Sequence, residues 1–251
     1  MDRVEQGWSA RSRPFFRMIK AILLDIEGTT TRIDFVHKIL FPLAKERVGN
    51  FVRENFADIA QEVSQLKIEH AADNGYSGPF DGNSPEPVAA YLKFLIDRDR
   101  KSTPLKSIQG KIWQKGYESR ELVSEIFEDV PRALKRWKSE SKIVAIYSSG
   151  SVLAQKLLFR YSDHGDLTPF IDRYFDTSTG PKREPDSYGR IAVEMSLPPG
   201  ELLFISDVVE ELDAATAANM QTLLAVRSDK SPVADNPRNA FITSFDEVIL
   251  V

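Results

Sequence analysis

The chain has 251 residues, 42% hydrophobic and 28% charged, a composition typical of a folded globular protein rather than a disordered or fibrous one. Its formal net charge of −4 disfavours general nucleic-acid binding, which usually requires a basic protein. The sequence contains no cysteine, which excludes disulfides, thiolate metal sites, iron–sulfur clusters and cysteine nucleophiles.

The N-terminal segment differs from the rest of the chain. Residues 1–17 are rich in arginine, but Asp2 and Glu5 argue against a transit peptide. The longest apolar run nearby, Ala21–Leu24, is too short for a signal peptide, and no segment approaches the ~18 apolar residues that span a membrane. We therefore interpret residues 1–17 as a disordered extension and expect the folded unit to begin at Met18.

The spacing of apolar residues predicts an α/β protein. Ile19–Leu24 is a short apolar run of the kind that forms a buried parallel strand. Residues 34–120 have helical spacing and no strand pattern, with a turn rich in glycine and proline at 73–87. Further strands are predicted at 142–147, 173–175, 201–205 and 222–226, and helices at 131–139, 152–159, 185–195, 210–218 and, after a capping box, at 244–247.

Alternating strands and helices indicate a parallel sheet with helices on both faces. We assign residues 18–33 and 121–251 to this core, and 34–120 to an inserted all-helical cap. An insertion after the carboxyl end of a strand lies above the ligand crevice of such a sheet. The 73–87 loop carries Tyr76 and Phe80, and we expect closure of the cap over the crevice to exclude water and shape specificity; the alternative is that both aromatic rings only pack the cap.

Polar residues follow the predicted strands: Asp25, Glu27, Ser148, Ser149, Lys182 and Asp207. Because parallel strands end at one edge of a sheet, we expect these side chains to converge in one crevice. Asp25 and Asp207 can bind a hard cation such as Mg²⁺ through oxygen. The Ser148–Gly150 segment opens a helix and can bind an anion, and Lys182 adds a positive charge. A carboxylate nucleophile, a divalent cation, an anion site and a lysine are the components of phosphoryl transfer.

Each of these residues also has a structural interpretation when taken alone. An Asp after a strand is commonly a cap, and Ser148 and Ser149 are typical helix N-caps. Glu210 and Glu211 read as first-turn residues that suit the helix dipole. The functional interpretation depends on the order and strand-end placement of the whole set. No dinucleotide-binding, P-loop or serine-hydrolase motif is present, and the histidines lack metal-ligand spacing.

The segment Leu23-Leu-Asp-Ile-Glu-Gly-Thr-Thr30 resembles motif one of the haloacid dehalogenase superfamily. Its Asp-x-Glu-Gly-Thr form is characteristic of the enolase-phosphatases, also called acireductone synthases. The resemblance continues through Ile146–Val152, Gly180–Glu184 and Phe204–Ala215, and it covers about residues 19–227. It implies a Rossmann-like parallel-sheet core with an inserted helical cap.

The resemblance also implies a role for each site residue. Asp25 is the nucleophile and a magnesium ligand, Glu27 is the acid/base residue whose backbone carbonyl also contacts the metal, and Asp207 is a further magnesium ligand. The implied substrate-binding residues are Ser148, Ser149 and Lys182.

Three positions depart from the pattern of the family. Arg120 and Asn219 stand where we expect glycine, and Pro185 stands where we expect a small residue. None of the three is a catalytic position, but Arg120 lies near the junction of cap and core.

The implied activity is that of a bifunctional enolase-phosphatase of L-methionine salvage, a magnesium-dependent phosphoric monoester hydrolase. It converts 2,3-diketo-5-methylthiopentyl 1-phosphate to the acireductone 1,2-dihydroxy-3-keto-5-methylthiopentene and phosphate. We expect a monomer that acts on this small phosphorylated diketone, with no nucleic-acid or membrane partner. We expect it in the cytoplasm, with the nucleus as a second compartment.

Three alternatives stay open at this point. The first is a plain phosphatase of the same superfamily with another small phosphate ester as substrate. The second is a dehalogenase, although that chemistry has no use for the acid at Glu27. The third is a phospho-accepting receiver module, although such modules lack a helical insertion like 34–120.

Overall fold

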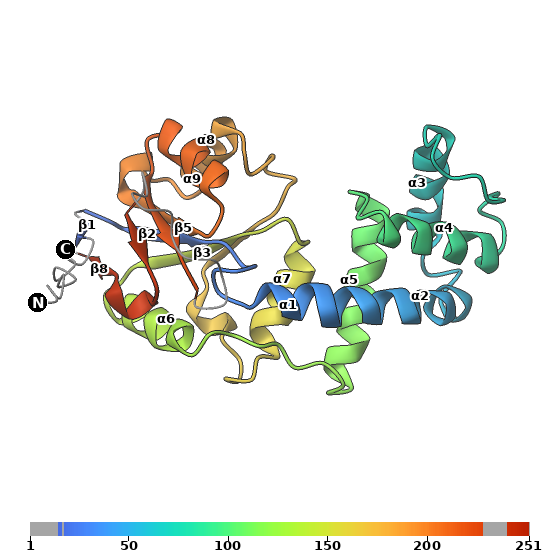
Figure 1. The fold of residues 1–251 in the computed structure, drawn as a ribbon, viewed down its shortest axis with the longest axis horizontal. Coiled ribbons are helices and arrows are strands. Elements are labelled where there is room, and N and C mark those ends of the chain that lie inside the picture. Colours follow the sequence, from blue (N-terminus) through green and yellow to red (C-terminus); the bar gives the residue numbers. More distant parts are fainter. Residues whose placement is uncertain (1–14, 17, 228–239, 251) are drawn as a thin grey trace, which may run out of the picture.

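Six parallel strands form the centre of an α/β core, and a group of helices projects from one side of it (Figure 1). The structure is a computed structural model that describes residues 15, 16, 18–227 and 240–250. The sheet has the order β4-β3-β2-β5-β6-β7. Its strands are β2 (Ala21–Leu24), β3 (Ile143–Tyr147), β4 (Arg173–Phe175), β5 (Leu202–Ser206), β6 (Gln221–Ala225) and β7 (Phe241–Ile242). The predicted parallel sheet is thereby confirmed.

Strand β2 lies in the middle of the sheet. Ala21 is in register with Ile143 of β3 on one side and with Leu202 of β5 on the other. All four β2 residues are fully buried, which explains why the strand is a continuous apolar run rather than an alternating one. The residue that follows β2, Asp25, therefore enters the middle of the carboxyl edge of the sheet.

Helices cover both faces of the sheet (Figure 1). Trp137 of α6 (Asp129–Ser139) and Phe159 of α7 (Val152–Arg160) pack on the face that includes Ile22. Helices α8 (Pro185–Glu194) and α9 (Val209–Ala217) pack on the face that includes Leu23. Short helical turns complete the core: η2 (Thr168–Phe170), η3 (Pro199–Glu201) and η4 (Phe245–Glu247), the last begun by the predicted capping box.

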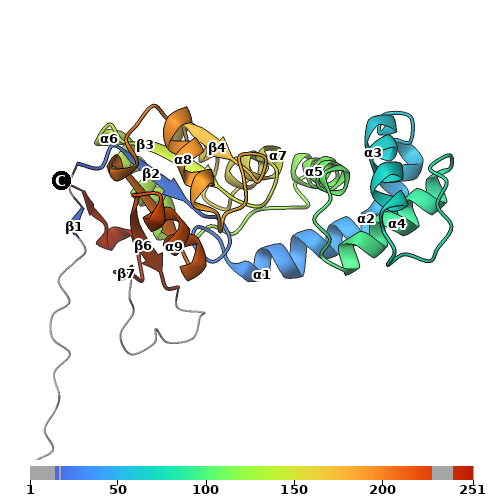
Figure 2. The ribbon, with the colours of Figure 1, turned by 90° about the horizontal axis from the view of Figure 1, so that it is seen from above.

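All elements between β2 and α6 are helical, which confirms the inserted cap. They are α1 (Ile33–Phe35), the π-helix η1 (Val36–Leu40), α2 (Phe41–Glu54), α3 (Ala60–Ala71), α4 (Pro85–Asp97) and α5 (Thr103–Glu118). Helix α5 lies against α7 of the core, whereas α3 and α4 lie at the end farthest from the core (Figure 2). The cap thus meets the core through α1, η1 and α5.

The 73–87 loop lies at the outer end of the cap and does not close over the crevice. Tyr76 and Phe80 pack against a cap core that includes Tyr91, and the Phe80 ring is stacked on the His70 ring with centroids 4.6 Å apart. The loop follows α3 away from the sheet, so its two aromatic rings do not reach the crevice; closure of the cap as a whole stays a prediction. The alternative for the two rings, packing within the cap, describes the structure.

Two very short pairings were not predicted. Strands β1 (Phe15–Phe16) and β8 (Ile249–Leu250) form a separate two-stranded parallel sheet, and β7 adds an edge to the main sheet. Phe15 and Phe16 fall within the segment that we interpreted as an extension. The rest of that segment, 1–14 and 17, lies outside the described residues.

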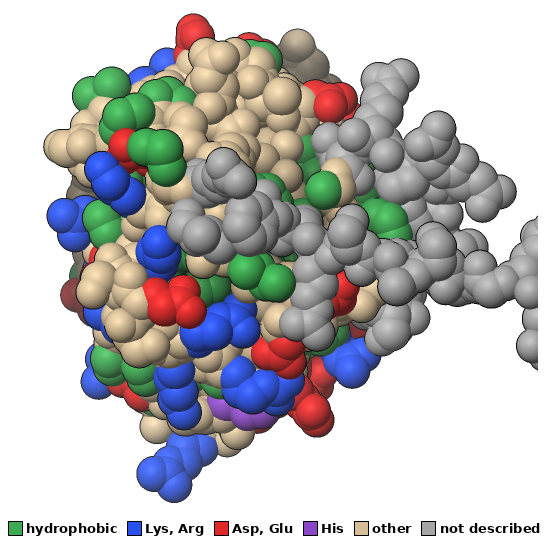
Figure 3. Space-filling view, turned by 90° about the vertical axis from the view of Figure 1, so that its left-hand side faces the viewer, with side chains coloured by type: hydrophobic (Ala, Val, Ile, Leu, Met, Phe, Trp, Pro, Cys, Tyr) green, Lys and Arg blue, Asp and Glu red, His purple; other side chains and the backbone are tan. Residues whose placement is uncertain are grey.

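The end of the core away from the cap carries basic side chains interspersed with acidic ones (Figure 3). Two basic residues of α6 are paired: Arg132 lies 2.7 Å from Asp246, and Lys138 lies 2.5 Å from Asp172.

Among the described residues, no helix is long and apolar enough to cross a membrane.

Candidate active site

A tight turn after β2 places the first two candidate residues. The Asp25 N–H donates to the Ile205 carbonyl at 3.0 Å, which extends the pairing of β2 with β5 by one residue. Gly28 adopts φ 71°, a left-handed conformation that favours glycine. The N–H groups of the next three residues, all threonines, donate to the Ile26 carbonyl at 2.9–3.2 Å. This turn holds Asp25 and Glu27 at the carboxyl edge of the sheet.

Arg227 fixes the same turn from the core side. Its guanidinium donates to the Thr29 carbonyl, from Nε at 2.9 Å and from Nη2 at 2.5 Å. It also forms a buried ion pair with Asp129 at 2.7 Å and lies between the rings of Phe127 and Phe245. Because the guanidinium is fully engaged by these partners, Arg227 acts as a positioning residue for the turn.

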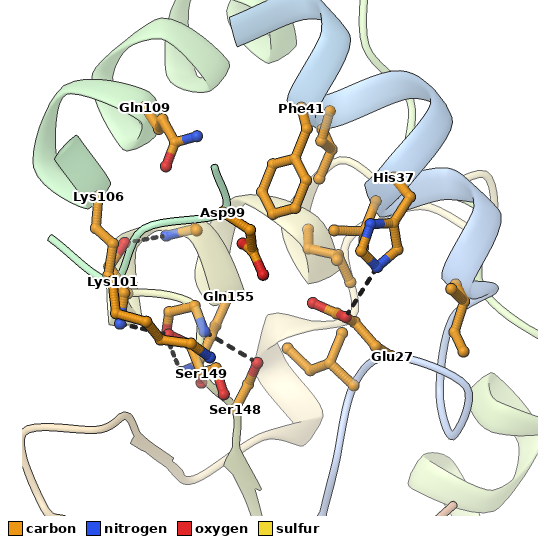
Figure 4. Close-up of a pocket in the computed structure, with 18 of the residues that line it drawn as sticks. Glu27, His37, Phe41, Asp99, Lys101, Lys106, Gln109, Ser148, Ser149 and Gln155 are labelled. Carbon is orange, nitrogen blue, oxygen red and sulfur yellow. Dashed lines mark hydrogen bonds and ion pairs between the residues drawn. The ribbon is translucent and has the colours of Figure 1, made fainter. Parts of the chain in front are cut away.

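A cavity of about 510 Å³ lies between the carboxyl edge of the sheet and the cap. All six candidate residues line it: Asp25, Glu27, Ser148, Ser149, Lys182 and Asp207. Figure 4 shows Glu27 and the two serines facing this cavity from the core, with cap residues opposite them. The expected convergence of the strand ends in one pocket is thus present in the structure.

Lys182 links two buried carboxylates at the floor of the pocket. Its Nζ lies 2.6 Å from Asp25 Oδ1 and 2.5 Å from Glu211 Oε2. The Ser206 hydroxyl lies 3.1 Å from Glu211 Oε2 and 3.4 Å from Asp25 Oδ2. The Tyr188 hydroxyl donates to the Lys182 carbonyl at 2.7 Å and thereby fixes the loop that carries the lysine.

Burial and the neighbouring charges have opposite effects on the pKa of Lys182. Burial acts to lower the pKa of Lys182, but Asp25 and Glu211 outweigh it and raise that pKa, so the lysine stays charged. Burial and the neighbouring Asp25 raise the pKa of Glu211 despite its pairing with Lys182. One ammonium thus bridges two buried carboxylates, Asp25 and Glu211, at the floor of the pocket.

Ser148 and Ser149 form the opposite wall. The Gly150 N–H donates to the Ser148 hydroxyl at 3.2 Å. The N-cap of α7 is Ser151, whose hydroxyl accepts from the Ala154 N–H at 3.3 Å. The structural interpretation of the two serines as N-caps is therefore wrong. Their position beside the N-terminus of α7 is suited to an anion.

Glu27 faces the pocket from the turn after β2. Its side chain is 41% exposed, and its Oε2 lies 3.9 Å from His37 Nε2 on the π-helix η1 (Figure 4). Burial in the pocket, followed by the negative charge of Asp25, raises the pKa of Glu27 above its ordinary value. A raised pKa suits a carboxyl group that must carry a proton.

Residues that the sequence interpretation missed also belong to the pocket. Glu211 was read as a first-turn helix residue, but it pairs with Lys182. Lys106 and Gln109 come from α5 of the cap and line the side opposite the sheet (Figure 4). The cluster of two acids after Asp207 was a usable signal for Glu211, whereas nothing in the local sequence marks Lys106 or Gln109.

Comparisons with known proteins agree with the geometry. Residues 19–219 match the family model of the haloacid dehalogenase-like hydrolases. The enolase-phosphatase E1 of Synechococcus elongatus is 47% identical, covering 92% of this chain and 98% of the relative. That of Leptospira borgpetersenii is 49% identical, covering 84% and 90%.

A solved structure extends the likeness to the fold. The UTR4 protein of Saccharomyces cerevisiae is 35% identical and superimposes with a TM-score of 0.77, covering 92% of this chain and 100% of the yeast chain. The sequence identities extend over most of both chains in each comparison, so the similarity is not confined to the motifs. The chain therefore belongs to the haloacid dehalogenase-like hydrolases and, within them, to the enolase-phosphatase family.

Proposed function

We propose that this chain converts 2,3-diketo-5-methylthiopentyl 1-phosphate to the acireductone and phosphate, the enolase-phosphatase reaction of L-methionine salvage. One observation carries the proposal beyond the family name. The six residues that the resemblance assigns to catalysis and binding, 25, 27, 148, 149, 182 and 207, line a single pocket. That pocket lies beneath a helical cap, which a receiver module lacks, and it contains Glu27, for which a dehalogenase has no use.

The donor atoms fit a magnesium ion. The Asp25 and Asp207 carboxylates and the Glu27 carbonyl supply oxygen only, which is the donor type that Mg²⁺ prefers. Lys182 donates a hydrogen bond to Asp25 Oδ1. Among the described residues, Asp25 Oδ2 accepts a hydrogen bond only from the Ser206 hydroxyl, at 3.4 Å, so this oxygen is available to a metal ion. No group of three or more acidic or histidine side chains in the described part of the chain is arranged as a metal site. The remaining oxygen ligands would come from substrate phosphate and water. When bound, magnesium supplies positive charge for the phosphoryl group and for a carbonyl oxygen.

Dephosphorylation uses the floor of the pocket. Asp25 forms a bond to phosphorus as the bond from phosphorus to the substrate oxygen breaks, and Glu27 gives that oxygen a proton. Ser148, Ser149 and Lys182 hold the phosphate oxygens. Water then attacks the phosphorus of the aspartyl phosphate and loses a proton to Glu27, while the bond between phosphorus and the Asp25 oxygen breaks. Inorganic phosphate leaves, the Asp25 carboxylate is restored, and Glu27 is protonated again.

Enolisation precedes that step. A C1–H bond breaks, its electron pair forms the C1=C2 double bond, and a proton is added to the C2 oxygen, so that the enol is an isomer of the diketone. The pocket has room for the rest of the substrate on its cap side, where the wall is apolar: Val36, Leu40, Phe41, Leu105 and Trp113. An apolar wall suits the methylthioethyl tail.

The substitution Asp25→Asn tests the proposal. It preserves the shape of the side chain, and Lys182 keeps Glu211 as a partner. We expect release of phosphate from the diketone phosphate to fall by at least about 10³-fold. NMR should still detect deuterium exchange at C1 if the metal site persists. Asp34→Asn, at an exposed position in α1, is the matched control and should change neither rate.

Rapid phosphate release by Asp25→Asn would overturn the assignment of the nucleophile. Wild-type protein that hydrolyses simple phosphate esters but forms no ultraviolet-absorbing enediol from the diketone phosphate would leave a plain phosphatase as the function. Turnover with and without Mg²⁺ tests the metal.

The remaining proposals concern the setting of the reaction. We propose a core of 18–33 and 121–251 with a cap of 34–120. We also propose that the chain acts as a monomer in the cytoplasm and nucleus, without nucleic acid or membrane. Light scattering during gel filtration and imaging of a tagged chain are the measurements for these points.

A further inference from the structure

One side of α5 forms the roof of the pocket. Leu105, Lys106, Gln109 and Trp113 all line the cavity, and their spacing places them on one side of a helix. Ser102 caps this helix by accepting from the Leu105 N–H at 3.2 Å, so the polar pair at 106 and 109 lies in its first two turns. Helix α5 thus presents two polar side chains in an otherwise apolar roof.

Gln109 is a buried polar group directed into the cavity. Its exposed fraction is 6%, and its amide points toward the open space between cap and core (Figure 4). The side chain makes no hydrogen bond to any residue that the structure describes. An amide that faces a cavity instead of a protein partner has its donors and acceptor available there. Water occupies such a group in the free protein, and a ligand with oxygen atoms can replace that water.

Lys106 lies one turn earlier on the same side of α5. Its Nζ donates to the Ser149 carbonyl at 2.9 Å and to the Thr177 hydroxyl at 3.1 Å. An ammonium has three N–H donors, so one remains for a ligand. These contacts place Nζ beside the proposed phosphate site, whereas Gln109 is about 4.5 Å farther along the helix axis.

We propose that Lys106 and Gln109 bind the two adjacent carbonyl oxygens of a vicinal diketone and so select substrates of that class. The inference rests on the proposed function. Lys106, beside the phosphate site, faces the C2 carbonyl next to the phosphate-bearing carbon, and Gln109 faces C3. Both side chains donate hydrogen bonds to oxygen, and the bond to the C2 oxygen strengthens as that oxygen gains negative charge during enolisation.

The electrostatics of the pocket agree with this assignment. Burial and the nearby Lys101 lower the pKa of Lys106, and Asp176 opposes them. An ammonium with a lowered pKa is a stronger hydrogen-bond donor to a developing oxyanion. The other charged residues of the roof, Asp99 and Arg100, also line the cavity.

The test compares two substrates. The first is the diketone phosphate, followed by C1 deuterium exchange and enediol absorbance. The second is n-pentyl phosphate, which has the phosphate ester but no carbonyl. For Gln109→Leu and Lys106→Met, we expect the ratio of the two kcat/KM values to fall about 10²-fold, the usual effect of losing one such donor. Deuterium exchange should fall with it.

Gln114→Leu and Lys115→Met are the matched controls on the same helix. Both residues lie outside the pocket lining, and their side chains bond to Glu118 and Asn55 respectively. Each control should leave both kcat/KM values within about twofold of wild type. Thermal unfolding of every variant separates loss of function from loss of fold.

Two outcomes would overturn the inference. An equal loss on both substrates would make these residues part of the phosphate site or of the fold. No loss on either would make Gln109 an ordinary pocket-lining residue. Gln109→Leu is the decisive variant, because Gln109 has no described partner whose loss could disturb the fold. If the proposed function itself were wrong, the wild-type protein would form no enediol from the diketone phosphate, and this result distinguishes that failure from a failure of the inference.

Discussion

The raised pKa of Glu27 predicts that its ionised side chain opposes folding at neutral pH. Its pKa is raised above the ordinary value of 4.5 by burial and by Asp25. A carboxyl group with a raised folded-state pKa favours folding while it is protonated. That contribution is complete below pH 4.5 and is lost as the pH rises through the raised value.

We therefore predict that Glu27→Gln raises the melting temperature of the metal-free protein at pH 7 and abolishes turnover. The gain should shrink as the pH falls toward 4, because the wild-type side chain then becomes protonated as well. Thermal unfolding in a chelating buffer between pH 4 and 8 measures it. Glu54→Gln, at an exposed position at the end of α2, should show no such trend. A gain that is equal at every pH would contradict the prediction.

Single residues of the site differ in how far the sequence could predict them. Asp25, Asp207 and the Ser148–Ser149 pair follow strands, and the carboxyl edge of a parallel sheet brings strand ends together in any fold of this kind. The role of Glu211 could not be predicted, because it depends on an ion pair with Lys182, which lies in another loop. The role of Gln109 could not be predicted either, because the direction of its side chain depends on how α5 lies over the core.

At the scale of elements, the end of α5 shows how a departure from the family pattern is accommodated. Arg120 adopts φ 61° just beyond the helix, where the next two N–H groups donate to the Gly116 carbonyl at 3.0 Å. Asn219, the second position where glycine is expected, adopts φ 66° after α9. Both positions are left-handed, which explains why glycine is expected there.

We predict that Arg120→Gly stabilises the protein by about 0.5–1 kcal/mol. The left-handed conformation costs an L side chain about 1–2 kcal/mol, and part of the gain is offset by the greater chain entropy of glycine in the unfolded state. Urea unfolding measures the change. Glu118→Gly, at the exposed last residue of α5, should instead destabilise the protein, by less than the ~1 kcal/mol that glycine costs in a helix interior. A loss of stability in Arg120→Gly would show that the arginine side chain makes a compensating contact.

The core elements of three or more residues that the sequence predicted, including β4, were placed to within one or two residues, whereas the two-residue strands could not be predicted. Strand β3 and helix α7 have enough residues to display an apolar period. Strands β1, β7 and β8 have two residues each, which is too few for any pattern, and they form only because other strands lie beside them. The π-helix η1 has the same apolar spacing as an α-helix at this length, so sequence alone does not separate the two.

At the scale of the whole molecule, the pocket and the tip of the cap are separate regions. The tip contains the Phe80–His70 stack, and none of its aromatic residues lines the cavity. We predict that Phe80→Ala lowers the free energy of unfolding by about 1–3 kcal/mol and leaves KM and kcat within about twofold of wild type. Phe41→Ala, in the cavity wall, should raise KM. Steady-state kinetics with urea unfolding checks both.

A large rise in KM for Phe80→Ala would indicate that the tip reaches the substrate after all. The organisation of core and cap was predictable from one change of pattern, from helical spacing to alternating strands and helices near residue 121. The direction in which the 73–87 loop points was not, because it depends on the packing of α3 and α4.

The central place of β2 has a consequence for how the chain folds. Ala21 pairs with Ile143 and with Leu202, so the strand that precedes Asp25 can pair only with neighbours more than a hundred residues away in the sequence. The cap helices meet one another through much shorter stretches of chain. Because loop closure delays long-range pairing, the cap should gain hydrogen-exchange protection before the sheet does. Because β2 pairs with β5 (Leu202–Ser206), the carboxyl edge of the sheet that lines the pocket cannot be complete before that segment has been synthesised.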